Sequence, residues 1–235
     1  MSGRLFISGV QARRIMVIRD GREQTFAELP DGLSPLGMGI DVAAGRLWVA
    51  AASMTQSDGA TASQQGHSAL LAFDMASGAL SARYDAPPVA GGRALNDIAI
   101  GPDRSVYASD ANDGSIFRLS PGAPALAVVG RLGLLKSPQG MVVSAGGGQL
   151  LTADYAAGLV TLNIDTGRIR PVSVPRDVTT VTLDGLDQLA DGSFVATQNG
   201  IHPARLVHFR LSPTGAEWSP LRSLPKGRNS LIRLS

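Results

Sequence analysis

The sequence has no cysteine, few aromatic residues and little charge. Aromatic residues make up 5% and charged residues 17% of the 235 positions. Without cysteine, a disulfide framework, a thiolate metal site and a cysteine nucleophile are all excluded. The formal net charge is only +2, and no run of Lys and Arg is interleaved with aromatic residues. We therefore expect no nucleic-acid partner.

Long apolar runs are also absent. No stretch approaches the roughly 18 apolar residues of a membrane span, so we expect no membrane partner. The N-terminal segment MSGRLFISGVQARR lacks the apolar core of a signal peptide. A cytoplasmic location is the resulting prediction; removal of an export signal would instead make the protein periplasmic or secreted.

Turn-forming residues and period-two alternation are abundant. The chain contains 28 Gly and 14 Pro, and 44% of its residues are hydrophobic. Alternation of apolar and polar residues, typical of half-buried strands, dominates over helical periodicity. These features predict an all-β protein in which residues 1–235 form a single domain.

A repeated pattern supports a more specific fold. Four segments share an apolar strand, a turn and a second strand: LGMGIDVAAGRLWVAAAS (36–53), LNDIAIGPDRSVYASDAN (95–112), PQGMVVSAGGGQLLTADYA (138–156) and LDGLDQLADGSFVATQNG (183–200). Further strands follow each segment, and a four-stranded repeat of about 40–50 residues is typical of a β-propeller blade. The first interval is longer because of TQSDGATASQQG (55–66), which we interpret as a flexible loop insertion. Trp48 and Tyr107 occupy the same place in their second strands, so we expect them to pack between blades.

The two ends of the chain supply parts of a fifth blade. The segments RLFISGVQ, RRIMVIRD and REQTFAEL predict three strands without the innermost one. The C-terminal segment NSLIRLS (229–235) predicts a lone strand. If this strand pairs with the first three, the ring closes with five blades, and closure removes unpaired strand edges. The alternative is a six-bladed propeller that has been shortened at both ends.

The repeats resemble those of a known family. SPQGMVVSAGGGQLLTADYAAGLVTLNIDTG is similar to a blade of the senescence-marker-protein/gluconolactonase (regucalcin-like) family of six-bladed propellers, as are LNDIAIGPDRSVYASD and LDGLDQLADGSFVATQNG. The resemblance covers most of residues 3–211. It implies lactone hydrolysis with a divalent metal, typically calcium, at the top of the channel. By motif, Asp184, Asn96 and Gln139 match positions that bind metal or substrate; the family's Glu ligand has no match, because the strand that should carry it is missing.

The chemistry of these side chains agrees with that implication. Met38, Asn96, Gln139 and Asp184 are expected at the same step of four successive blades, at one mouth of the channel. Carboxylate and amide oxygens suit calcium or magnesium rather than zinc. A metal there would polarise a lactone carbonyl, and Asp184 could take a proton from the attacking water. The structural alternative is that Asn96 and Asp184 bond backbone amides, as Asx turns do.

Two further residues are candidates for substrate binding. Gln198 stands at the end of a second strand, where Asp110 and Asp154 stand in other blades, and His202 follows in the loop NGIHPAR. We expect Asp110 and Asp154 to cap turns. The competing interpretation makes Gln198 such a cap and His202 an ordinary surface-loop residue.

Two classes of function therefore remain open. The first is a metal-dependent hydrolase of a lactone or related cyclic ester. The second is a non-catalytic propeller that binds a small molecule or a protein partner through a degraded metal site. A third possibility is a strictosidine-synthase-like relative that uses the channel without metal. In the first case we expect a monomer with a small-molecule substrate.

Overall fold

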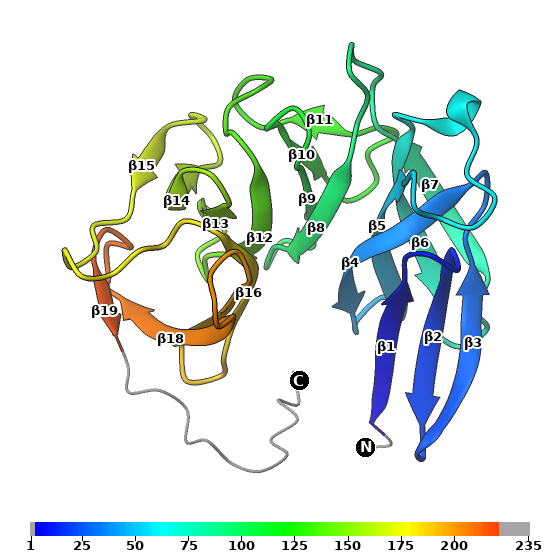
Figure 1. Cartoon of the computed structure of the whole chain (residues 1–235), viewed down its shortest axis with the longest axis horizontal. Helices are drawn as coiled ribbons and strands as arrows, with labels where there is room; N and C mark the ends of the chain where they lie inside the picture. The colour runs from blue at the N-terminus through cyan, green and yellow to red at the C-terminus, as the bar shows by residue number, and fades with distance from the viewer. Residues whose placement is uncertain (1–2, 221–235) are drawn as a thin grey trace.

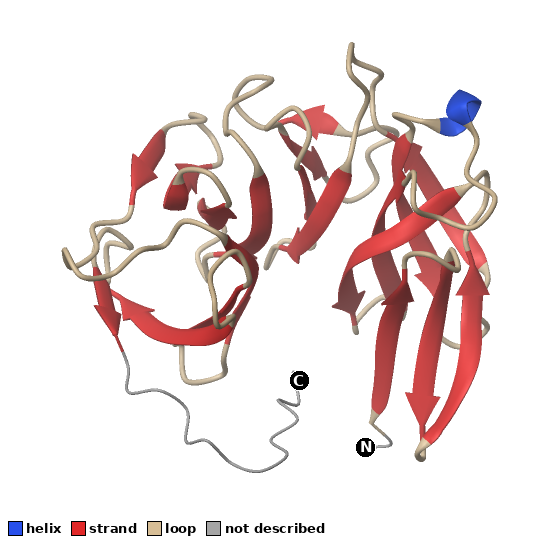
Figure 2. Ribbon diagram, in the orientation of Figure 1, coloured by secondary structure: helices blue, strands red, loops and turns tan. Residues whose placement is uncertain are grey.

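The computed structural model describes residues 3–220, which form five antiparallel β-sheets arranged as a β-propeller (Figures 1 and 2). The one helical element in this part of the chain is the short 3-10 turn η1, Ala62–Gln64. Between residues 3 and 220, no helix has the length and hydropathy needed to cross a bilayer. The prediction of an all-β propeller is confirmed.

The sheets follow one another along the chain, and we call them blades 1 to 5. Blade 1 contains β1 (Arg4–Gly9), β2 (Arg14–Arg19) and β3 (Arg22–Glu28). Blade 2 contains β4 (Leu33–Asp41), β5 (Arg46–Ser53), β6 (Ser68–Asp74) and β7 (Leu80–Asp85). Blade 3 contains β8 (Leu95–Ile100), β9 (Val106–Asp110), β10 (Ile116–Leu119) and β11 (Ala127–Val128). Blade 4 contains β12 (Pro138–Val143), β13 (Gln149–Asp154), β14 (Gly158–Asn163) and β15 (Ile169–Pro171). Blade 5 contains β16 (Leu183–Gln188), β17 (Phe194–Gln198), β18 (Arg205–Leu211) and β19 (Trp218–Pro220).

The position of a strand within its blade explains its residue pattern. In blade 2 the middle strands β5 and β6 are rich in Ala and Leu, and nearly every side chain is buried. A strand with packed neighbours on both faces reads as a continuous apolar run. The outer strand β7 instead alternates between exposed and half-buried residues, because one of its faces meets solvent.

The first strand of each complete blade lines the centre of the arc seen in Figure 1. These inner strands are β4, β8, β12 and β16, and each packs against the next. The second strand of a blade also packs against the next inner strand, as β5 does on β8. Since β1 packs on β4 in the same way, the strands that residues 3–220 contribute to blade 1 do not include an innermost one, as predicted.

Closure of the ring by the C-terminus stays a prediction. The segment NSLIRLS (229–235) lies outside the described residues. Within residues 3–220, blade 1 is the one sheet with three strands.

The hydrophobic core is divided among the interfaces between blades. Four clusters of buried residues join blades 1 and 2, 2 and 3, 3 and 4, and 4 and 5. Trp48 lies in the second of these and Tyr107 in the third, and both are buried. The expectation that they pack between blades is confirmed.

The predicted turn caps are also confirmed. Asp110 and Asp154 are fully buried at the ends of β9 and β13. The carboxylate of Asp110 accepts hydrogen bonds from the backbone N–H groups of Ala94 (3.1 Å) and Asn112 (3.0 Å). Asp154 does the same with four backbone N–H groups.

The insertion at residues 55–66 is fastened to its neighbours. The backbone N–H of Asp58 donates to Gln11 O at 2.9 Å. Ser57 is buried, and its hydroxyl bonds to that of Ser34 at 2.5 Å. The flexibility of this loop stays a prediction.

Candidate active site at the channel mouth

A β-bulge interrupts each inner strand at the same step. The registers shift between Pro35 and Met38 in β4, and between Leu95 and Ile98 in β8. They also shift between Pro138 and Met141 in β12, and between Leu183 and Leu186 in β16. Bulges re-aim side chains and are frequent beside functional sites. The four bulged pairs are Leu36-Gly37, Asn96-Asp97, Gln139-Gly140 and Asp184-Gly185.

The bulges correct one sequence prediction. Met38 pairs with Val49, as Ile98 pairs with Ala108, so Leu36 and not Met38 stands at the step of Asn96. Met38 instead packs against the core between blades 1 and 2. The prediction failed because Met38 and Ile40 are two residues apart in an alternating strand, so an alignment of apolar residues can match either of them to Ile98.

Asn96 and Asp184 line one cavity at the mouth end of the inner strands. The cavity has a volume of about 250 Å³. Its lining consists of Leu36, Gly37, Asn96, Asp97, Gly140, Asp184 and Gly185. The structure thus brings together Asn96 of blade 3 and Asp184 of blade 5, as the sequence predicts.

Gln139 orients Asn96. The side-chain amide of Asn96 donates to Gln139 Oε1, and Gln139 Nε2 donates to the hydroxyl of Ser137 at 3.1 Å. A planar amide whose nitrogen is held in this way directs its oxygen to the opposite side.

The side chain of Asp184 also has a side-chain partner. Asn199 Nδ2 donates to Asp184 Oδ2 at 2.5 Å. In the described part of the chain, the hydrogen bonds made by the Asn96 and Asp184 side chains go to side chains rather than to backbone amides. This arrangement differs from the Asx turns of the structural alternative.

Sequence reasoning missed Asp97, which follows Asn96 in the bulge. Its Oδ2 atom accepts a hydrogen bond from the backbone N–H of Met141 at 2.9 Å, across the interface between blades 3 and 4. The other three bulges have glycine at this step, so Asp97 is the one with a side chain there. That contrast within the repeat is the signal that could have identified it.

The environment of Asp97 raises its pKa to about 7. Burial is the main cause, and the nearby negative charges of Asp184 and Asp187 add to it. Hydrogen bonds from the backbone N–H groups of Ile98 and Met141 act in the opposite direction. A strongly shifted carboxyl in a cavity is typical of a functional site.

Gln198 does not reach the cavity. It is fully buried, and its Nε2 donates to the carbonyl groups of Thr179 (3.2 Å) and Val181 (2.7 Å). Arg205 Nε donates to its Oε1 at 2.9 Å. The structure therefore gives Gln198 the same capping place as Asp110 and Asp154, with an amide donor in place of a carboxylate acceptor.

His202 is not among the residues that line the cavity either. It is exposed in the loop between β17 and β18. The structure thus brings together Asn96, Gln139 and Asp184, adds Asp97, and leaves out Gln198 and His202.

Ionisable ligands are sparse for a metal site. Within residues 3–220, no three His, Cys, Asp or Glu side chains lie close enough together to share one ion. A cation at the mouth would depend on the carboxylate of Asp184 together with neutral oxygens such as that of Asn96, with Asp97 beside them. Calcium accepts such mixed oxygen ligands.

Comparison with known proteins identifies the fold of this chain but assigns it to no family. No protein-family model matches the chain, and no curated protein does. Among solved structures, virginiamycin B lyase from Staphylococcus aureus has a TM-score of 0.64 at 14% identity, covering 94% of this chain and 68% of that one. A putative oxidoreductase (glucose dehydrogenase) from Thermus thermophilus has a TM-score of 0.60 at 18% identity, covering 94% and 80%. A putative 6-phosphogluconolactonase from Bacteroides uniformis has a TM-score of 0.57 at 12% identity, covering 92% and 66%. At these identities the likeness concerns the fold alone: the chain is a β-propeller, similar to propellers with lyase, dehydrogenase-like and lactonase-like descriptions.

Proposed function

We propose that this protein hydrolyses a lactone or a related cyclic ester in the cavity at the channel mouth. The observation that supports the proposal is that Asn96 and Asp184, from two different blades, line one cavity together with the half-buried Asp97. The described neighbours include propellers with lactonase-like and lyase descriptions, which agrees with hydrolase-like chemistry in this fold. Fold alone does not assign function, so the site carries the proposal.

The residues at the mouth fit a divalent cation, with calcium as the first candidate. Asp97 and Asp184 are carboxylates, and the Asn96 oxygen is left free by the bond from its nitrogen to Gln139. Burial and the two neighbouring acids Asp184 and Asp187 raise the pKa of Asp97, so a cation at this place would stabilise the charged form of its carboxyl. Asp184 and Asn96 would hold the ion, with Gln139 positioning Asn96. When bound, the ion would polarise the ester carbonyl.

The protein's own groups divide the remaining work. Gln139 fixes the Asn96 amide so that its oxygen has one orientation. Asn199 restrains the Asp184 carboxylate. Asp97 lines the same cavity beside Asp184 and Asn96, and its carboxylate is placed to receive a proton from the attacking water.

Hydrolysis of glucono-δ-lactone in 1 mM calcium, followed in a pH-stat, tests the proposal. Asp184→Asn keeps the size of the side chain and removes its charge, and should lower the rate on the order of 100-fold or more. Asp191→Asn is the matched control, because Asp191 lies in the exposed turn between β16 and β17. Equal rates for wild type and Asp184→Asn would show that the site is assigned wrongly.

The second candidate is a propeller that binds its small molecule or partner without catalysis. The observation that favours it is the absence, within residues 3–220, of a third ionisable ligand at the mouth. Calcium titration by calorimetry separates the two candidates: no heat of binding at millimolar calcium, together with no lactone hydrolysis, supports the binding protein. For the hydrolase we propose a monomer with a small-molecule substrate, and for both candidates no nucleic-acid or membrane partner.

A further inference from the structure

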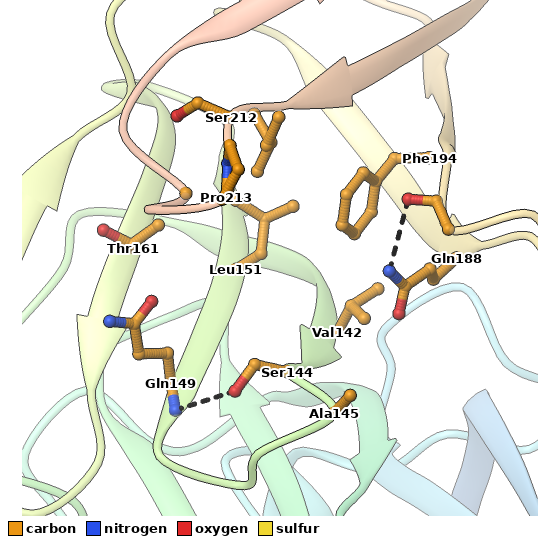
Figure 3. A pocket seen from close by; sticks show the side chains of 13 residues that line it. Val142, Ser144, Ala145, Gln149, Leu151, Thr161, Gln188, Phe194, Ser212 and Pro213 are labelled. Carbon is orange, nitrogen blue, oxygen red and sulfur yellow. Dashed lines mark hydrogen bonds between the residues drawn. The ribbon is translucent and has the colours of Figure 1, made fainter.

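A second cavity lies between blades 4 and 5, at the ends of β12 and β16 opposite to the mouth (Figure 3). Its volume is about 220 Å³. Along β12, Gln139 stands at the mouth end while Val142 and Ser144 line the second cavity. At about 3.3 Å per residue, Val142 and Ser144 lie roughly 10 and 17 Å from Gln139 along the strand direction. The two cavities share no lining residue, so they are separate.

One wall of this second cavity is apolar and aromatic. Leu151, Val142 and Phe194 contribute side chains from β13, β12 and β17, as Figure 3 shows. Phe194 stacks on Phe209, with ring centroids 5.4 Å apart and an angle of 20° between the planes. Phe209 in turn stacks on Trp218 at 3.8 Å and 13°. The cavity is therefore bordered by the end of a three-ring aromatic stack.

The polar side chains of the cavity are two amides and the hydroxyls of Ser144, Thr161 and Ser212. Gln149 and Gln188 lie on its rim (Figure 3). Gln188 Nε2 donates to Gly192 O at 3.4 Å, and none of the described residues donates a hydrogen bond to Gln188 Oε1. Each amide offers both a donor and an acceptor. None of the residues that line the cavity is ionisable.

We propose that this cavity binds an uncharged planar ring with an amide or lactam edge. A flat ring that stacks on Phe194 would continue the Phe194–Phe209–Trp218 stack, since aromatic rings favour offset stacking. The lactam edge matches the two glutamine amides, and the lack of ionisable lining residues disfavours a charged ligand, whose desolvation would be uncompensated. Cavities of about 150 Å³ already admit a benzene ring, so this one has room for a ring and its polar edge.

Binding of 2-quinolone, measured by ligand-observed NMR on the full chain, tests the proposal. Wild type should bind the probe, and Thr161→Phe, which fills the cavity from β14, should weaken binding at least about tenfold. The double variant Gln149→Leu/Gln188→Leu keeps the volume and removes the amides, and should also weaken binding about tenfold. Gln24→Leu, an exposed glutamine of β3, is the matched control and should bind as wild type does.

Further measurements make the outcome decisive. Asp184→Asn should bind 2-quinolone unchanged, because the two cavities are separate. Equal binding of the charged quinoline-2-carboxylate, or binding that ignores both cavity variants, would overturn the proposal. The proposal would also be overturned if a chain ending at Pro220 bound the probe ten times more tightly than the full chain, because residues 221–235 would then occupy the cavity themselves. Absence of binding at millimolar probe would also overturn it.

Discussion

The surroundings of acidic residues at the two ends of the inner strands shift their pKa values in opposite directions. At the mouth, burial and the charges of Asp184 and Asp187 raise the pKa of Asp97 to about 7. In the turns at the other end, the pKa values of Asp103 and Asp191 are lowered. Asp103 pairs with Arg118 at 2.8 Å, and Asp191 pairs with Arg210 at 2.7 Å.

The difference teaches which aspartates hold the fold and which have another purpose. The turn acids bond a serine two residues later and meet an arginine from the adjacent strand, β10 or β18. The acids at the mouth have other acids as neighbours: the charges of Asp184 and Asp187 raise the pKa of Asp97. Structural ion pairs account for the first group, whereas a buried acid that costs stability is typical of a functional site.

The largest expected effect comes from removing the positive partner of a buried acid, which leaves that acid without a counter-charge. Arg93 is buried and pairs with Asp110, at 3.2 Å, and with Asp113. Arg93→Met leaves Asp110 buried and without its positive partner, and should lower the free energy of unfolding by about 3–5 kcal/mol. Urea denaturation measures this loss. A loss below about 1 kcal/mol would mean that burial of these acids matters less than we infer.

The next effect concerns the close approach of the inner strands at the mouth. A Cβ atom on Gly140 would lie 2.6 Å from Asp184 O and closer still to Leu186 N, both backbone atoms. Gly140→Ala should therefore cost about 2 kcal/mol and disturb the cavity, lowering activity. Gly146, at the opposite end of the same blade, has nothing within 4 Å of its added Cβ, so Gly146→Ala should stay within about 0.5 kcal/mol of wild type. Equal unfolding midpoints for both variants would contradict the close approach.

Removing the charge of Asp97 should stabilise the protein at alkaline pH. Its folded pKa lies above the value of about 3.9 in an unfolded chain. Its contribution to stability is thus fully present below pH 4 and is lost as pH rises through 7. Asp97→Asn should match wild type near pH 4 and exceed it at pH 8, on the order of 2 kcal/mol. The measurement is urea unfolding of both proteins in EDTA; a constant difference between them across this range would contradict the shift.

The smallest effect is expected for an exposed turn pair. Burial raises the pKa of Asp103, but Ser105 and Arg118 outweigh it, and the net direction is down. This stability is present above the unfolded pKa of Asp and is lost as pH falls through the folded one. Because the side chains are 32% and 49% exposed, Arg118→Met should cost only about 0.2–1 kcal/mol at pH 7 and nothing at pH 2. A loss as large as that of Arg93→Met would erase the distinction between buried and exposed pairs.

Much of the fold was predictable because its signals are local. Alternation gave the strands, the repeat gave the blades, and Asp110 and Asp154 were identified as caps from their place at strand ends. The candidate site was predictable in part. Asn96, Gln139 and Asp184 do come together, but Gln198 turns inward because its amide donates to the carbonyl groups of Thr179 and Val181. The repeat offered this outcome only as the competing interpretation, since Gln198 stands where Asp110 and Asp154 stand.

The sequence by itself determined the order of strands, the all-β fold and the blade as a unit, since hydrophobic periodicity and turn residues act within a few positions along the chain. The tertiary structure decided which bulge residues face the mouth, that Leu36 replaces Met38 in that ring, and that Asp97 becomes a shifted acid. These outcomes depend on how strands some 40 residues apart approach one another. Desolvation and Coulomb interactions are set by all neighbours in space, and a carboxyl carries no mark of them in its sequence.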